Sequence, residues 1–165
     1  MRSGSQSELL RGLESLALDV VLTNIHPPRD ASSQWLITKL AEQPVSLIGT
    51  AKRLGRKKMK LAELIAAHPL VLPTPETSLR AAFDALAATL DVAPQIAAEA
   101  DDMAMLRLLT REDAGLCVIP PIVVRDELAS GKLVEAMRLD GIQETFLAVT
   151  LSRRFPNPLL RSVLN

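Results

Sequence analysis

The sequence predicts an α/β fold in which crossover helices connect the strands of a parallel sheet. Within residues 68–121, short apolar segments typical of buried strands alternate with helical patterns. Two proline-containing turns separate these segments, one over residues 73–78 and the other at Pro120 and Pro121. Because α/β folds bind small ligands at polar turns that follow strands, we interpret this stretch as half of a ligand-binding cleft.

Composition limits the classes of function. The chain has 165 residues, of which 48% are hydrophobic and 23% charged, so it can bury a core and is globular. Its net charge of +0 and aromatic content of 2% argue against a nucleic-acid-binding surface. A single cysteine, Cys117, lies in an apolar run, so we expect a core residue in a reducing compartment.

Neither export nor membrane insertion is expected. The first seven residues are polar and no apolar signal segment follows them, and no window approaches 18 apolar residues. We therefore expect a cytoplasmic protein without membrane contact. We expect no metal, cofactor or enzymatic activity, because neither spaced metal ligands nor a nucleophile with a nearby base can be recognised.

Helices are predicted from leucine spacing and capping residues. Ser5 or Ser7 can cap a first helix, and Thr77 or Ser78 can cap a helix that carries Leu79, Phe83, Leu86 and Leu90 on one face. The other predicted helices cover residues 61–67, 122–129 and 158–164. One more helix is predicted to begin at the acidic residues 99–102. The predicted strands cover residues 18–23, 35–40, 44–49, 69–72, 94–98, 116–119, 132–137 and 145–151.

Three polar features each have a functional and a structural interpretation. The basic run 52–60 can be a phosphate or nucleic-acid patch or a solvated connector, and the zero net charge favours the connector. The cluster Glu99, Asp101 and Asp102 can bind a cation or can complement a helix dipole. The helix start at Thr77 or Ser78 can bind an anion or can be an ordinary capped end.

The order of segments resembles the C-terminal effector-binding domain of LysR-type transcriptional regulators, and the likeness covers nearly the whole chain. Within that family the chain looks most similar to regulators of the sodium/proton antiporter activator type. The matching segments are ELLRGLESLALDVVLTN, PVSLIGT, GRKKMKLAELIAAHPLVLPTPETSLR, APQIAAEADDMAMLRLLTREDAGLCVIPPIVVRDELASGKLVEA and TFLAVTLSRRFPNP.

This resemblance implies an α/β fold like that of type 2 periplasmic binding proteins, with two Rossmann-like lobes joined by two crossover strands. Residues 1–51 and 145–165 would form lobe I, residues 52–144 would form lobe II, and the crossings would lie near 50–53 and 143–147. The family's N-terminal helix-turn-helix and the first strand and helix of lobe I have no counterpart here. Lobe I is therefore expected to be truncated at its N-terminus, and DNA is expected to be bound only through a domain absent from this chain.

The resemblance also implies the site and its partners. A small-molecule or ion effector would bind between the lobes of a protein that forms a dimer or tetramer at full length. The alternative is a solute-binding protein of a transport system. By position, the implied effector-binding residues are Thr74, Glu76, Thr77, Ser78, Glu99, Asp101, Asp102 and Pro120 in lobe II, and Thr23, Asn24 and His26 in lobe I. The local carboxylates favour a cationic or neutral effector.

Overall fold

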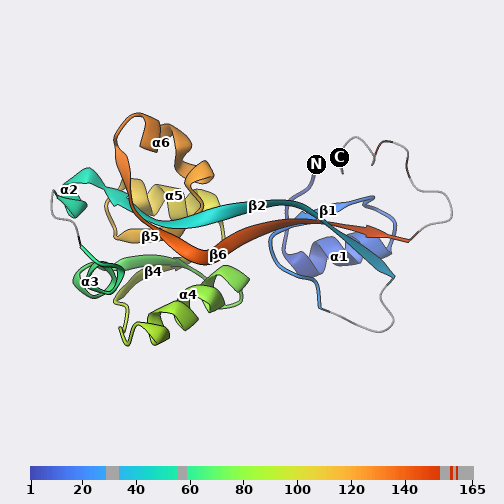
Figure 1. The fold of residues 1–165 in the computed structure, drawn as a ribbon. Helices are drawn as coiled ribbons and strands as arrows, with labels where there is room; N and C mark the ends of the chain where they lie inside the picture. The colour runs from blue at the N-terminus through green and yellow to red at the C-terminus, as the bar shows by residue number, and fades with distance from the viewer. Residues whose placement is uncertain (29–33, 56–58, 153–156, 158, 160–165) are drawn as a thin grey trace. The chain divides into compact units, whose positions relative to one another are not determined.

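A computed structural model describes residues 1–28, 34–55, 59–152, 157 and 159. The chain forms two compact units, which are described separately. The first contains Met1–Glu42 and Thr145–Asn165, and the second contains Gln43–Glu144. The long strands β2 (Trp35–Thr50) and β6 (Leu133–Leu151) contribute residues to both units, as Figure 1 shows. The predicted α/β class is confirmed. Among the described helices, none has the length and apolar character needed to cross a membrane.

In the first unit, a helix packs on a small antiparallel sheet. Helix α1 (Gln6–Glu14) is capped by Ser5, whose hydroxyl accepts a hydrogen bond from the Glu8 N–H at 3.3 Å. Strand β1 (Val21–Thr23) pairs antiparallel with β6, and the strand order is β1–β6–β2. The core of this unit is formed by Leu10, Leu13, Val21 and Val149.

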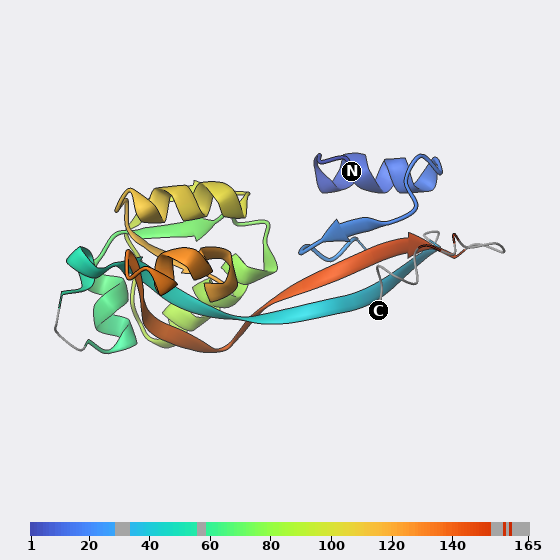
Figure 2. The same ribbon diagram turned by 90° about the horizontal axis from the view of Figure 1, so that it is seen from above.

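The second unit has three layers, with a sheet between two groups of helices (Figure 1), and Figure 2 views the same layers from above. Its strand order is β6–β2–β5–β3–β4, in which β3 is parallel to β4 and β5 while β2 is antiparallel to β5. After β2, its elements are α2 (Ala51–Leu54), α3 (Leu61–Ala67), β3 (Leu70–Pro73), α4 (Ser78–Thr89), β4 (Ile96–Ala100), α5 (Met103–Arg111), β5 (Leu116–Ile119), the 3-10 helix η1 (Pro121–Val124) and α6 (Arg125–Ala129).

Alternation along the strands builds two cores in this unit. Because successive strand side chains point to opposite faces, Leu70 and Leu72 of β3 face one helix layer while Val71 faces the other. The first core includes Leu64 and Ile65 of α3 and Leu79 and Phe83 of α4. The second includes Leu106 of α5, Val124 of η1, Cys117 and Ile119. Burial of Cys117 raises the pKa of its thiol to about 12, so the thiol is protonated at neutral pH.

The predicted strand boundaries need correction at both long strands. The segments 35–40 and 44–49 are one strand, β2, and the segments 132–137 and 145–151 are one strand, β6. Pro44 does not end β2, because a proline ring is compatible with extended backbone and only removes one donor. The first strand is also shorter than predicted, since Leu18 belongs to the turn after α1 and donates its N–H to the Gly12 carbonyl at 3.0 Å.

Two predicted helices differ in the structure, and a third lies outside the described residues. Glu99 and Ala100 do not open a helix but end strand β4, and α5 begins only after Asp102. The helix predicted over 122–129 divides into η1 and α6. The final helix predicted over 158–164 lies outside the described residues except for Leu159.

The basic run has a more specific local structure than a solvated connector. Lys52 and Arg53 lie in α2, and the Arg53 Nε donates to the Asp113 carboxylate at 2.8 Å. The Thr50 hydroxyl donates to the same carboxylate at 2.8 Å. Burial raises the pKa of Asp113, but these bonds and the Arg53 charge outweigh burial and lower it below its ordinary value. Residues 56–58 of the run lie outside the described part.

Candidate functional site

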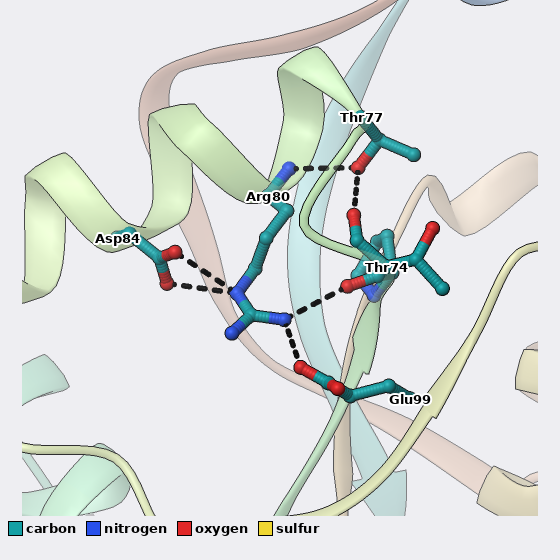
Figure 3. Close-up of polar contacts among 6 residues, drawn as sticks. Thr74, Thr77, Arg80, Asp84 and Glu99 are labelled. Atoms are coloured by element: carbon teal, nitrogen blue, oxygen red, sulfur yellow. Dashed lines mark hydrogen bonds and ion pairs between the residues drawn. The ribbon is translucent and has the colours of Figure 1, made fainter.

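The polar turn after β3 is held in place by the cap of helix α4. The Thr77 hydroxyl accepts a hydrogen bond from the Arg80 N–H at 3.1 Å and donates one to the Thr74 carbonyl at 3.0 Å (Figure 3). Thr77 is therefore the N-cap residue, and its side chain is buried in that role. Glu76 and Ser78, by contrast, are exposed, so of these predicted residues they are the ones that present side chains to solvent.

Arg80 joins this turn to the neighbouring strand, although the sequence did not single it out. Its Nη1 donates to the Pro73 carbonyl at 3.1 Å and to the Glu99 carboxylate, while its Nε donates to both oxygens of Asp84 at 2.9 and 3.0 Å. Figure 3 shows the guanidinium between these two carboxylates. Arg80 is only 8% exposed, so it is a nearly buried cation with two anionic partners.

The protonation of Arg80 follows from these contacts. Burial alone lowers the pKa of a guanidinium, but the hydrogen bonds and charges of Glu99 and Asp84 raise it further than burial lowers it. Arg80 therefore stays charged. The spacing of Arg80 and Asp84, four residues apart on a helix, was a signal in the sequence for the first contact. Nothing in the sequence indicated that Glu99 would be the second partner.

The predicted acidic cluster divides into residues with different environments. Asp102 caps α5, and its Oδ1 accepts from the Ala104 and Met105 N–H groups at 2.6 and 3.0 Å. Glu99 is paired with Arg80, and Asp101 is exposed. Among the described residues no group of His, Cys, Asp and Glu side chains could hold a metal ion.

These lobe II candidates lie at one edge of the sheet. The turn beginning at Thr74 follows β3, Asp101 and Asp102 follow β4, and Pro120 follows β5, and these three strands are parallel neighbours. The Thr74 N–H donates to the Ala100 carbonyl at 3.2 Å, so the first two segments are in direct contact. Pro120 is buried and accepts a hydrogen bond from the Val123 N–H at 3.0 Å. The structure therefore brings together these polar turns as the parallel topology requires.

The lobe I candidates lie in the first unit. The Thr23 hydroxyl accepts from the Ile25 N–H at 3.1 Å and donates to the Ile25 carbonyl at 3.3 Å, so it is used in a local turn. Asn24 is half-buried and His26 is exposed. A hollow of about 660 Å³ in this unit is lined by His26, Pro27, Ile37, Lys39, Glu42, Thr145 and Leu147. Of the predicted site residues, His26 alone is among those lining this hollow.

This fold, with polar turns after its parallel strands, is of the α/β class that binds small ligands at strand ends. The family model for the LysR substrate binding domain matches residues 1–165, and the chain belongs to that family. It therefore shares the fold of LysR effector-binding domains, which is of the type 2 periplasmic-binding-protein kind. A search of curated proteins finds no match.

Solved structures of LysR regulators have the same fold. A Pseudomonas aeruginosa protein described as a LysR family transcriptional regulator superposes with a TM-score of 0.76 at 19% identity, covering 99% of this chain and 57% of that one. The regulatory domain of HypT from Salmonella typhimurium superposes with a TM-score of 0.73 at 12% identity, covering 98% of this chain and 76% of that one. The effector binding domain of QuiR in complex with shikimate superposes with a TM-score of 0.69 at 15% identity, covering 96% of this chain and 74% of that one. Identities this low establish a shared fold alone.

Proposed function

We propose that this domain senses a small molecule or ion at the polar turn Thr74–Ser78, together with Glu99, Asp101, Asp102 and Pro120 in lobe II and Thr23, Asn24 and His26 in lobe I. The observation that carries the proposal is the contact between the turns that follow β3 and β4, made by the Thr74 N–H and the Ala100 carbonyl at 3.2 Å. The exposed residues Ser78 and Glu76 and the first turn of α4 follow this contact at the same edge of the sheet, which supports the proposal.

The domain acts within a longer regulator. This chain spans 57% of the length of the Pseudomonas aeruginosa protein, so DNA binding is assigned to a separate N-terminal helix-turn-helix domain. An effector that binds one arrangement of the domain more tightly shifts a pre-existing equilibrium, which changes how paired DNA-binding domains meet their half-sites. The regulator is proposed to be a cytoplasmic homo-oligomer, either a dimer or a tetramer, without enzymatic activity or membrane contact. A transport-system solute-binding protein is not favoured, because the matched family and the named structures are those of LysR regulators.

The proposed lobes are residues 1–51 with 145–165 and residues 52–144. The division of the chain into units supports the second boundary, because it also falls between Glu144 and Thr145. The first division falls between Glu42 and Gln43, which is earlier in the chain than the proposed boundary after residue 51. Membership of the sodium/proton antiporter activator subgroup stays a prediction based on sequence resemblance.

The effector is proposed to be neutral or cationic. Glu76 and Asp101 are exposed near the turn, and Glu99 and Asp84 neutralise the charge of Arg80. An anion would meet this excess of carboxylates and would be repelled, whereas an amine or a metal cation would not.

A thermal-shift screen of amines, metal cations, neutral polyols and carboxylates tests the proposal. A ligand that binds only the folded protein raises the free energy of unfolding, and with it the melting temperature. At a ligand concentration a hundred times the dissociation constant, this stabilisation is about 2.7 kcal/mol. We expect hits among the amines, cations or neutral compounds. Tight binding of carboxylates alone would contradict the proposed effector class, and the absence of any hit would contradict the sensing function.

Variants of α4 separate binding from stability. Ser78→Ala should weaken binding of a hit and leave stability nearly unchanged, because Ser78 is exposed and does not cap the helix. Thr77→Ala should lower the free energy of unfolding by about 1 kcal/mol, because it removes the cap. Thr89→Ala removes an exposed hydroxyl at the other end of α4 and serves as the control for binding.

A further inference from the structure

Arg80 has the features of an anion-binding residue whose anion is part of the protein. Its side chain is 9% exposed, and its Nη1 lies at the end of β3, where it donates to the Pro73 carbonyl at 3.1 Å. A guanidinium offers five donors in a planar fork that matches a carboxylate. At the same Nη1, the carboxylate of Glu99 accepts a hydrogen bond.

The two carboxylate partners of Arg80 differ in origin. Asp84 lies one turn further along α4 and binds Nε, so this pair belongs to a single helix. Glu99 comes from the end of β4, opposite Leu72 in the register of the two strands and next to the contact between Thr74 and Ala100. The Glu99 side chain is 39% exposed, so its carboxylate lies between the nearly buried guanidinium and solvent.

We propose that Glu99 is a specificity-determining residue whose carboxylate occupies, on Arg80, the position that an anionic effector group would take. This inference rests on the proposed effector site at the Thr74–Ser78 turn and gives a structural reason for its preference for neutral and cationic effectors. With Glu99 in place, the positive charge of Arg80 is already compensated by two carboxylates, and a second anion would face Asp84 and Glu99.

Removal of the Glu99 carboxylate should convert the position into an anion site. Truncation leaves a nearly buried guanidinium with one of its two anionic partners, an arrangement that costs stability. It also leaves a space, open to solvent, with the dimensions of the missing carboxylate. Acetate has the same charge and the same two-oxygen geometry as the missing carboxylate. It should therefore enter this space and accept a hydrogen bond from the Arg80 Nη1.

The experiment is chemical rescue of Glu99→Ala by acetate. Melting temperatures of the wild type and of the variant are compared in sodium acetate and in sodium chloride of equal ionic strength. Acetate at about ten times its dissociation constant should shift the folding equilibrium of Glu99→Ala about tenfold toward the folded state relative to chloride. The wild type should show no difference between the two salts.

Two further variants localise the effect. Glu99→Gln fills the space without a charge, so acetate should give it no stabilisation beyond that of chloride. The double variant Arg80→Gln with Glu99→Ala leaves a space without a cation, so it too should be insensitive to acetate. If Glu99→Ala is unfolded in chloride, recovery of its circular dichroism signal in acetate is the positive result, and failure to recover overturns the proposal.

Other outcomes also decide the matter. The proposal is overturned if wild type and Glu99→Ala respond equally to acetate, or if the double variant responds as strongly as the single one. In nuclear magnetic resonance spectra, acetate should shift the amides of Thr74, Thr77 and Ser78 in Glu99→Ala, and such shifts in the wild type would also overturn it. The rescue requires no natural effector, so its failure is distinguishable from failure of the wild-type ligand screen.

Discussion

Glu127 illustrates how a single buried carboxylate depends on its partners. Its side chain is 6% exposed, and its Oε1 accepts a hydrogen bond from the Arg107 Nε at 2.9 Å. The same oxygen lies 2.8 Å from the Arg107 Nη2 and 3.7 Å from the Arg111 Nε. The buried Oε2 has no hydrogen-bond partner among the described residues. Burial raises the pKa of Glu127, but the hydrogen bond from Arg107 and the charges of both arginines outweigh burial and lower it below the ordinary 4.5.

The lowered pKa of Glu127 predicts acid sensitivity. A carboxylate whose folded-state pKa is depressed stabilises the fold above its unfolded-state pKa, and this stabilisation disappears as pH falls through the folded-state value. Chemical unfolding measured from pH 7 to pH 3 should therefore show Glu127→Gln destabilised at pH 7, with a difference from the wild type that shrinks below about pH 4.5. A constant difference across this range would argue against the assignment. Asp126→Asn, at an exposed neighbouring position, should cost little stability at pH 7.

At the scale of elements, the pairing of β3 with β5 depends on Gly115. The Leu116 N–H donates to the Pro69 carbonyl at 2.9 Å, which brings the starts of the two strands together. A Cβ on Gly115 would lie 2.4 Å from the Pro69 carbonyl oxygen and 2.9 Å from its carbon. Since both are backbone atoms, the two strands would have to move apart to admit a methyl group.

Gly115→Ala should therefore lower the free energy of unfolding by about 1–3 kcal/mol, the usual cost of overpacking a dense interior. Urea denaturation measures it. The control is Gly4→Ala, where a Cβ would meet only the flexible end of the Glu8 side chain at 2.8 Å. Equal stability of the Gly115→Ala variant and the wild type would mean that the strands separate without cost.

At the scale of the whole molecule, each hydrophobic core belongs to one unit. The two cores around the sheet of the second unit use buried residues between Val45 and Ile142, and all of them lie within Gln43–Glu144. The core of Leu10, Leu13, Val21 and Val149 lies within the first unit.

A fragment of residues 43–144 should accordingly fold without the rest of the chain. Because the fragment keeps both of its cores, circular dichroism should show a single cooperative thermal transition. Cys117 is fully buried, so thiol reagents should not react with it until the fragment unfolds. Leu72→Ala in the fragment truncates a fully buried side chain and should lower the midpoint temperature of that transition. This variant serves as a control that the fragment has native packing. A gradual transition with a reactive thiol would contradict an independent core.

The sequence alone determined several local elements of the second unit. Proline turns, capping residues and leucine spacing predicted α3, β5 and the start and apolar face of α4, because these signals act over a few neighbouring residues. Family membership was also readable from the order of segments and is confirmed by the family model. The continuity of β2 and β6 was not readable, since it depends on partner strands distant in the chain.

The tertiary structure decided how the polar groups of the candidate site are used. From the sequence, Thr77 and Ser78 were equivalent caps, and Glu99, Asp101 and Asp102 formed one acidic cluster. The fold makes Thr77 the cap, assigns Asp102 to α5 and pairs Glu99 with Arg80, nineteen residues away. The physical reason is that parallel pairing of β3 with β4 brings their carboxyl ends together, and a nearly buried guanidinium at that edge requires carboxylate partners.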